Sequence, residues 1–156
     1  MAGRGDLRRF PRGVERRLRK SGWFPGRRVD TAPWRGVVAG VEMPAAVEAF
    51  LAEFGGLTVD VHGFAWGRTA AKEPFELDPT LCEGDDDRFP EWGEFLGRTL
   101  HPLGELDHGR FSLGMDELGA IYLVTDWLGL FGDGPADAAL TALCQGTMAR
   151  QLSPDN

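Results

Sequence analysis

The chain has 156 residues, of which 42% are hydrophobic and 10% aromatic, so it can form a hydrophobic core and is not expected to be disordered overall. This length fits one domain, and no run of about 18 apolar residues is present that would span a membrane. The net charge of −7 is unevenly distributed, because residues 1–28 carry +8 and the remaining residues carry −15. An acidic body repels nucleic acid and favours basic protein partners.

The N-terminal residues and the two cysteines suggest a cytoplasmic location. The N-terminus is charged but no apolar stretch follows it, so no signal peptide is expected. Cys82 and Cys144 are far apart in the sequence and are expected to be reduced thiols. Residues 1–9 are predicted to form a flexible basic arm. This arm could contact nucleic acid weakly, but the acidic charge of the other residues favours an arm that lies on the body or in solvent.

The first half of the chain shows helical periodicity followed by alternation. Apolar spacing, together with proline and glycine positions, predicts three helices, from Pro11 to Gly22, from Thr31 to Gly40 and from Pro44 to Gly55. The third is the clearest, because its apolar residues form one stripe: Val47, Phe50, Leu51 and Phe54. Alternation over 57–61 and the apolar residues at 75 and 77 predict two short strands.

The second half is predicted to be a helix, a run of strands and a final helix. One amphipathic helix is expected with an apolar face made of Trp92, Phe95, Leu96 and Thr99. Residues 103–131 are typical of an antiparallel meander, with turns near 107–109, 116–119 and 126. The last helix runs from Pro135 to Gly146. The predicted fold is a single α+β domain over residues 10–150, with a mainly antiparallel sheet and about five short helices.

The sequence contains no pattern that is typical of catalysis or cofactor binding. None of the histidines and cysteines has the spacing of a zinc or metalloprotease site. Serines lie outside any GxSxG context, and no glycine-rich phosphate-binding loop is present. We therefore expect no metal, no cofactor and no enzymatic activity.

Two features are candidates for binding a partner protein. Residues 83–87 form an acidic loop, Glu-Gly-Asp-Asp-Asp, in which Glu83, Asp85, Asp86 and Asp87 could steer and dock a basic partner. The first interpretation of this loop is a solvated, mobile segment that repels itself, and a docking patch is the functional alternative. Trp66, between two glycines, could be an exposed interface aromatic or a hairpin aromatic packed on the sheet.

Several short motifs, taken in order, resemble the SUKH superfamily of bacterial immunity proteins, and specifically its third subfamily. The similarity extends from about residue 10 to residue 146. The motifs are Gly-Trp-Phe-Pro-Gly-Arg at 22–27, Phe-Leu-Ala-Glu-Phe-Gly-Gly-Leu at 50–57, Phe-Glu-Leu-Asp-Pro at 75–79, Leu-His-Pro-Leu-Gly-Glu at 100–105 and Leu-Gly-Met-Asp-Glu-Leu-Gly-Ala-Ile-Tyr at 113–122.

This resemblance implies an α+β domain that binds a toxin and blocks it without catalysis. Superfamily members are encoded beside polymorphic toxins, many of which are nucleases. A nuclease is basic around its substrate groove, so an acidic inhibitor could occlude that groove. The expected partner is therefore a cognate toxin, in particular a basic nuclease. The alternative is a general protein-interaction or scaffolding domain, because some relatives in the superfamily have that role.

Overall fold

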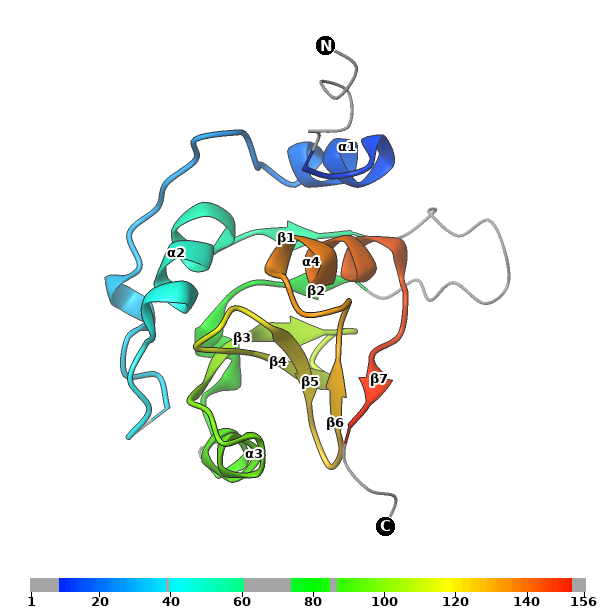
Figure 1. The fold of residues 1–156 in the computed structure, drawn as a ribbon. Helices are drawn as coiled ribbons and strands as arrows, with labels where there is room; N and C mark the ends of the chain where they lie inside the picture. The colour runs from blue at the N-terminus through cyan, green and yellow to red at the C-terminus, as the bar shows by residue number, and fades with distance from the viewer. Residues whose placement is uncertain (1–8, 39, 61–73, 85–86, 153–156) are drawn as a thin grey trace.

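The fold is built on one antiparallel sheet, seen in a computed structural model that describes residues 9–38, 40–60, 74–84 and 87–152 (Figure 1). Its seven strands follow one another across the sheet in chain order. Four α-helices and two 3-10 turns accompany them in the described residues. The predicted α+β class is confirmed, with four α-helices in place of about five.

Each strand pairs with the strands that precede and follow it in sequence. The strands are β1 Thr58–Val59, β2 Phe75–Glu76, β3 Leu100–Leu106, β4 Phe111–Asp116, β5 Ile121–Val124, β6 Leu128–Leu130 and β7 Arg150–Gln151. The predicted meander corresponds to β3–β6, although β3 begins at Leu100, three residues earlier than expected. The short final strand was not predicted. Its two residues are both exposed, so it has no alternation of buried and exposed side chains to reveal it.

The helices form where apolar periodicity predicted them, with one exception. They are α1 Arg12–Lys20, α2 Ala45–Phe54, α3 Arg88–Leu96 and α4 Ala136–Gln145. The predicted stripe of α2 is buried throughout. The helix expected from Thr31 to Gly40 is wrong, because only a 3-10 turn, η2 Ala32–Trp34, forms there. Arg35 is extended and Gly36 has a φ of 75°, a combination that ends any helical run.

The buried face of α3 also differs in part from the prediction. The predicted Trp92 and Leu96 are partly buried against the core, together with the fully buried Phe89 and Gly93. Phe95, by contrast, is 52% exposed, and Thr99 lies beyond the end of the helix. A Cβ added at Gly93 would lie 2.7 Å from the carbonyl oxygen of Arg98. This close approach fixes the rotation of α3 about its axis, and Phe95 consequently points outward.

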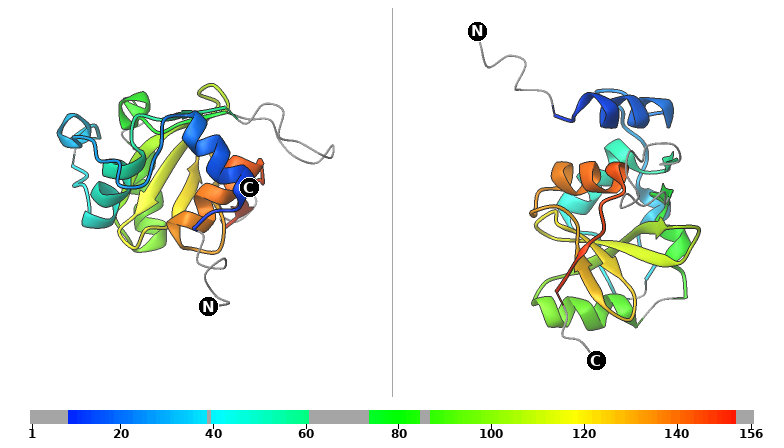
Figure 2. Two further views of the ribbon diagram at one scale, coloured as in Figure 1. Left: turned by 90° about the horizontal axis from the view of Figure 1, so that it is seen from above. Right: turned by 90° about the vertical axis from the view of Figure 1, so that its right-hand side faces the viewer.

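The helices divide the molecule into layers (Figure 2). One face of the sheet is covered by α2 and α4, and α1 packs on α4 from outside. The main hydrophobic core lies in this part of the molecule. At one end of the opposite face, α3 covers a second core cluster that includes Phe89, Leu100, Tyr122 and Val124. The strands at the other end, β1–β3, present polar side chains on that face, which is the outer face of the sheet.

Candidate functional site

Two of the sequence motifs meet at the C-terminal end of α2. The indole Nε1 of Trp23 donates to Glu53 Oε2 at 3.0 Å, and the Trp23 ring stacks on Phe54 at a centroid distance of 6.0 Å. Arg27 donates from Nη1 to the carbonyl of Glu53 at 2.6 Å and from Nη2 to the carbonyl of Gly55 at 2.9 Å. These carbonyls lie at the end of the helix, so Arg27 acts as a C-terminal cap. The motifs therefore maintain the fold.

The described end of the basic arm binds the body of the protein. Arg9 donates to Glu53 Oε2 at 2.7 Å and makes two hydrogen bonds of 2.9 Å with the carboxylate of Asp137 on α4. The hydrogen bonds to Asp137, and then to Glu53, raise the pKa of the Arg9 guanidinium above its ordinary value. For this residue the interpretation of an arm lying on the acidic body is supported, whereas residues 1–8 lie outside the described part.

The acidic loop is only partly described. Glu83 and Asp87 are both exposed, and neither forms an ion pair with another residue in the described ranges. Asp85 and Asp86, like Trp66, fall outside the described residues. Their assignment to a binding surface remains a prediction.

A second acidic surface is created by strand register on the outer face of β1–β3. Glu76 of β2 lies directly opposite Glu105 of β3 and, on its other side, opposite Thr58 of β1. Three further carboxylates lie just beyond the ends of these strands and are at least partly exposed, so they extend the surface past the paired residues. The last of them, Asp107, begins the β3–β4 turn with a φ of 58°. We call this surface the acidic sheet face: Asp60, Glu76, Asp78, Glu105 and Asp107.

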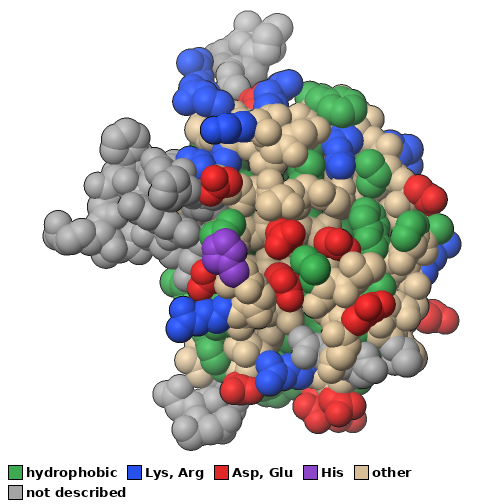
Figure 3. Space-filling model, turned by 180° about the vertical axis from the view of Figure 1, so that it is seen from behind, with side chains coloured by type: hydrophobic (Ala, Val, Ile, Leu, Met, Phe, Trp, Pro, Cys, Tyr) green, Lys and Arg blue, Asp and Glu red, His purple; other side chains and the backbone are tan. Residues whose placement is uncertain are grey.

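Acidic side chains gather in the middle of the rear view of the molecule (Figure 3). Within the acidic sheet face, Asp60 is exposed and the other four carboxylates are half-buried. Asp78 accepts from the backbone N–H of Thr80 at 3.0 Å, and Arg110 lies 3.4 Å from Asp107. This surface was not predicted from the sequence. The alternation of Glu105 and Asp107 was a signal for it, but which strands pair with them could not be inferred.

A buried carboxylate organises the turn between β4 and β5. Asp116 is fully buried and accepts from the hydroxyl of Tyr122 at 2.6 Å and from the backbone N–H groups of Leu118 and Ala120. Arg98, which follows α3, donates to it at 3.1 Å. Burial raises the Asp116 pKa, but these hydrogen bonds outweigh burial and hold it below its ordinary value. Burial and the bond to Asp116 raise the pKa of Tyr122 to about 12.

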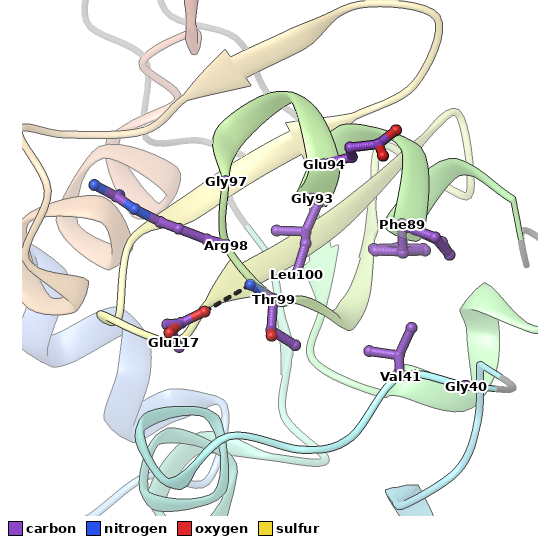
Figure 4. Close-up of a pocket in the computed structure, with 11 residues that line it drawn as sticks. Gly40, Val41, Phe89, Gly93, Glu94, Gly97, Arg98, Thr99, Leu100 and Glu117 are labelled. Carbon is purple, nitrogen blue, oxygen red and sulfur yellow. Dashed lines mark hydrogen bonds between the residues drawn. The ribbon is translucent and has the colours of Figure 1, made fainter.

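A hollow of about 500 Å³ lies between α3, the loop before α2 and the β4–β5 turn (Figure 4). We call it the α3 pocket. Its lining includes the apolar side chains of Val41, Phe89 and Leu100, and the charged residues Glu94 and Glu117. Glu117 accepts from the backbone N–H of Thr99 at 2.7 Å. This hydrogen bond fixes the position of the β4–β5 turn relative to the segment that follows α3.

One histidine and both cysteines lie in the interior. His101 is fully buried, its Nδ1 is 2.8 Å from the carbonyl oxygen of Pro102, and its Nε2 has no partner among the described residues. Burial lowers the His101 pKa. Both cysteines are buried thiols outside any disulfide, and Cys82 donates to the carbonyl of Gly104 at 3.2 Å. Burial raises the pKa of Cys144 to about 12. No group of three or more His, Cys, Asp or Glu side chains that could hold a metal occurs in the described ranges.

Comparison with known protein families assigns the chain to one of them. The SUKH-3 immunity protein family matches residues 10–146, which is most of the sequence, so the chain belongs to this family. The resemblance inferred from the motifs is thereby confirmed. No curated protein and no solved structure matches. None of the helices in the described residues is long and apolar enough to cross a membrane.

Proposed function

We propose that this chain is a cytoplasmic, non-enzymatic immunity protein that binds a cognate toxin, a basic nuclease, and blocks it stoichiometrically. Membership of the SUKH-3 immunity protein family is the observation that carries this proposal. The separation of charge supports it, because the residues after 28 carry −15. A nuclease groove is basic to hold phosphates, and an acidic surface complements it.

The acidic sheet face, extended by Glu83 and Asp87, is our candidate for the toxin-binding surface. The chain runs from Asp78 through the 3-10 turn η3 Pro79–Cys82 directly to Glu83, so the acidic loop continues from the edge of this face. Glu76 and Glu105 lie directly opposite one another on neighbouring strands, so two carboxylates stand side by side on this face. A basic partner complements such a pair.

Growth rescue tests the function. The protein encoded by the gene beside this one is expressed in bacteria with and without this chain. If the neighbouring gene product is the cognate toxin, it arrests growth when expressed alone, and co-expression of this chain restores growth. Arrest that continues despite soluble expression of both proteins contradicts the immunity proposal and favours the general interaction domain.

Association kinetics test the surface. Glu76→Lys and Glu83→Lys should each slow association with the purified toxin by roughly tenfold at low salt, because electrostatic steering is lost. This difference should diminish at high salt, where charges are screened. Asp133→Lys is the matched control, since this exposed residue lies outside both the acidic sheet face and the α3 pocket and makes the same change in net charge. If the wild type, the control and both variants associate at equal rates at low salt, Glu76 and Glu83 do not belong to the interface.

A further inference from the structure

We propose that the α3 pocket receives a long basic side chain, an arginine or a lysine, from a loop of the protein partner. This inference rests on the proposed function, because that function supplies a basic partner. It assigns a second contact surface, separate from the acidic sheet face. The pocket volume of about 500 Å³ falls within the range of functional binding pockets.

The apolar residues of the pocket suit the aliphatic part of such a side chain. Val41 and Phe89 face one another across the hollow, with Leu100 beside them (Figure 4). Three glycines among its lining residues, Gly40, Gly93 and Gly97, contribute no side chain to fill it. Long basic side chains bury their methylene groups on apolar surface of this kind while the charged end stays at the rim.

The charges at the rim favour a cation. Glu94 and Glu117 lie on opposite sides of the pocket (Figure 4). Arg98 also lines the pocket, but its guanidinium is hydrogen bonded to the buried Asp116 and extends away from Val41 and Phe89. Glu117 can still accept a further hydrogen bond beside the one from Thr99, and Glu94 adds a carboxylate at the outer edge of the rim, directed away from Val41 and Phe89 (Figure 4). These two charges match the charged end of an arginine or lysine.

The rim is held rigid before any partner arrives. Asp116 fixes the turn through the N–H groups of Leu118 and Ala120, and Glu117 is hydrogen bonded to Thr99. Leu118 stands next to Glu117 with 69% of its surface exposed, which offers an apolar contact beside the pocket. A site that is ordered in the free protein binds with a smaller loss of conformational entropy.

Binding of the full-length chain to the purified toxin tests the proposal by calorimetry. Glu94→Lys reverses one rim charge, and Thr99→Trp places a large side chain at the pocket. Each should weaken binding roughly tenfold or more. Glu91→Lys is the matched control, because Glu91 is exposed on the same helix but does not line the pocket, and its affinity should equal that of the wild type. Wild-type affinity for both pocket variants would overturn the proposal.

If the toxin does not bind the wild-type chain, the proposed function is refuted but the pocket proposal is not yet tested by that experiment. A second measurement then tests whether the pocket binds a basic side chain. The probe is N-acetyl-L-arginine amide, with the citrulline analogue as its uncharged isostere, titrated at millimolar concentration into labelled protein. Amide NMR shifts at Val41, Gly93, Gly97 and Thr99 that are larger for the arginine probe support the proposal. No shifts there, or equal shifts with both probes, overturn it.

Discussion

Replacing Asp116 by Asn should destabilise the protein by about 1.5–3 kcal/mol at pH 7. The substitution preserves shape, so no cavity forms. The asparagine carbonyl can still accept from the N–H groups of Leu118 and Ala120, and the Tyr122 hydroxyl can turn to accept from the new amide. The change removes the negative charge that strengthens all four hydrogen bonds, and it places an N–H group against Arg98.

The free energy of unfolding lost in Asp116→Asn should depend on pH. The Asp116 pKa is lower in the folded protein than in the unfolded chain, where it is near 3.8. The carboxylate therefore contributes its full stability above about pH 5. That contribution is lost as the pH falls through the folded-state value. The stability difference between wild type and Asp116→Asn should be largest at neutral pH and should shrink toward pH 2.

Urea unfolding followed by tryptophan fluorescence measures the loss of stability at pH 7 and its change with pH. The free energy of unfolding is obtained for each protein at several pH values between 2 and 7 by linear extrapolation. Tyr122→Phe is a useful companion, because it removes one donor to Asp116 and leaves the charge in place. A difference below about 0.5 kcal/mol at pH 7, or one that does not change with pH, would refute the idea that a charged Asp116 organises this turn.

Two further substitutions test other buried groups. His101→Phe should reduce the loss of stability between pH 7 and pH 5, because the lowered His101 pKa means that the unfolded chain takes up a proton which the folded protein resists. Thermal melts of both proteins at pH 7 and pH 5 measure this difference. The same pH dependence in the wild type and the variant would contradict the prediction. Arg27→Met should lower the free energy of unfolding by about 1–3 kcal/mol, because it removes two hydrogen bonds to the end of α2. The stability of Arg27→Lys should lie between those of the wild type and the methionine variant. Urea unfolding checks this, and wild-type stability for the methionine variant would disprove the capping role.

Local sequence patterns were sufficient to predict most elements of the fold. The stripe of α2 and the turns of the meander depend on neighbours within a few residues, and both were found. The helix expected after Thr31 failed because the extended Arg35 and the positive φ of Gly36 ended it after one turn. The face of α3 was right at Trp92 and Leu96 and wrong at Phe95, since the contact of Gly93 with the Arg98 carbonyl is made by tertiary packing.

The sequence by itself determined the fold class, the family and the uneven charge. Each of these depends on composition or on motifs whose residues are neighbours in the chain. The family motifs proved structural, with Trp23 and Arg27 bound to the end of α2. The acidic sheet face and the α3 pocket were decided only by the tertiary structure. Glu76 and Glu105 become neighbours through strand register, and the pocket joins segments far apart in the chain. Such contacts follow from packing and pairing across the whole molecule, which local sequence spacing does not encode.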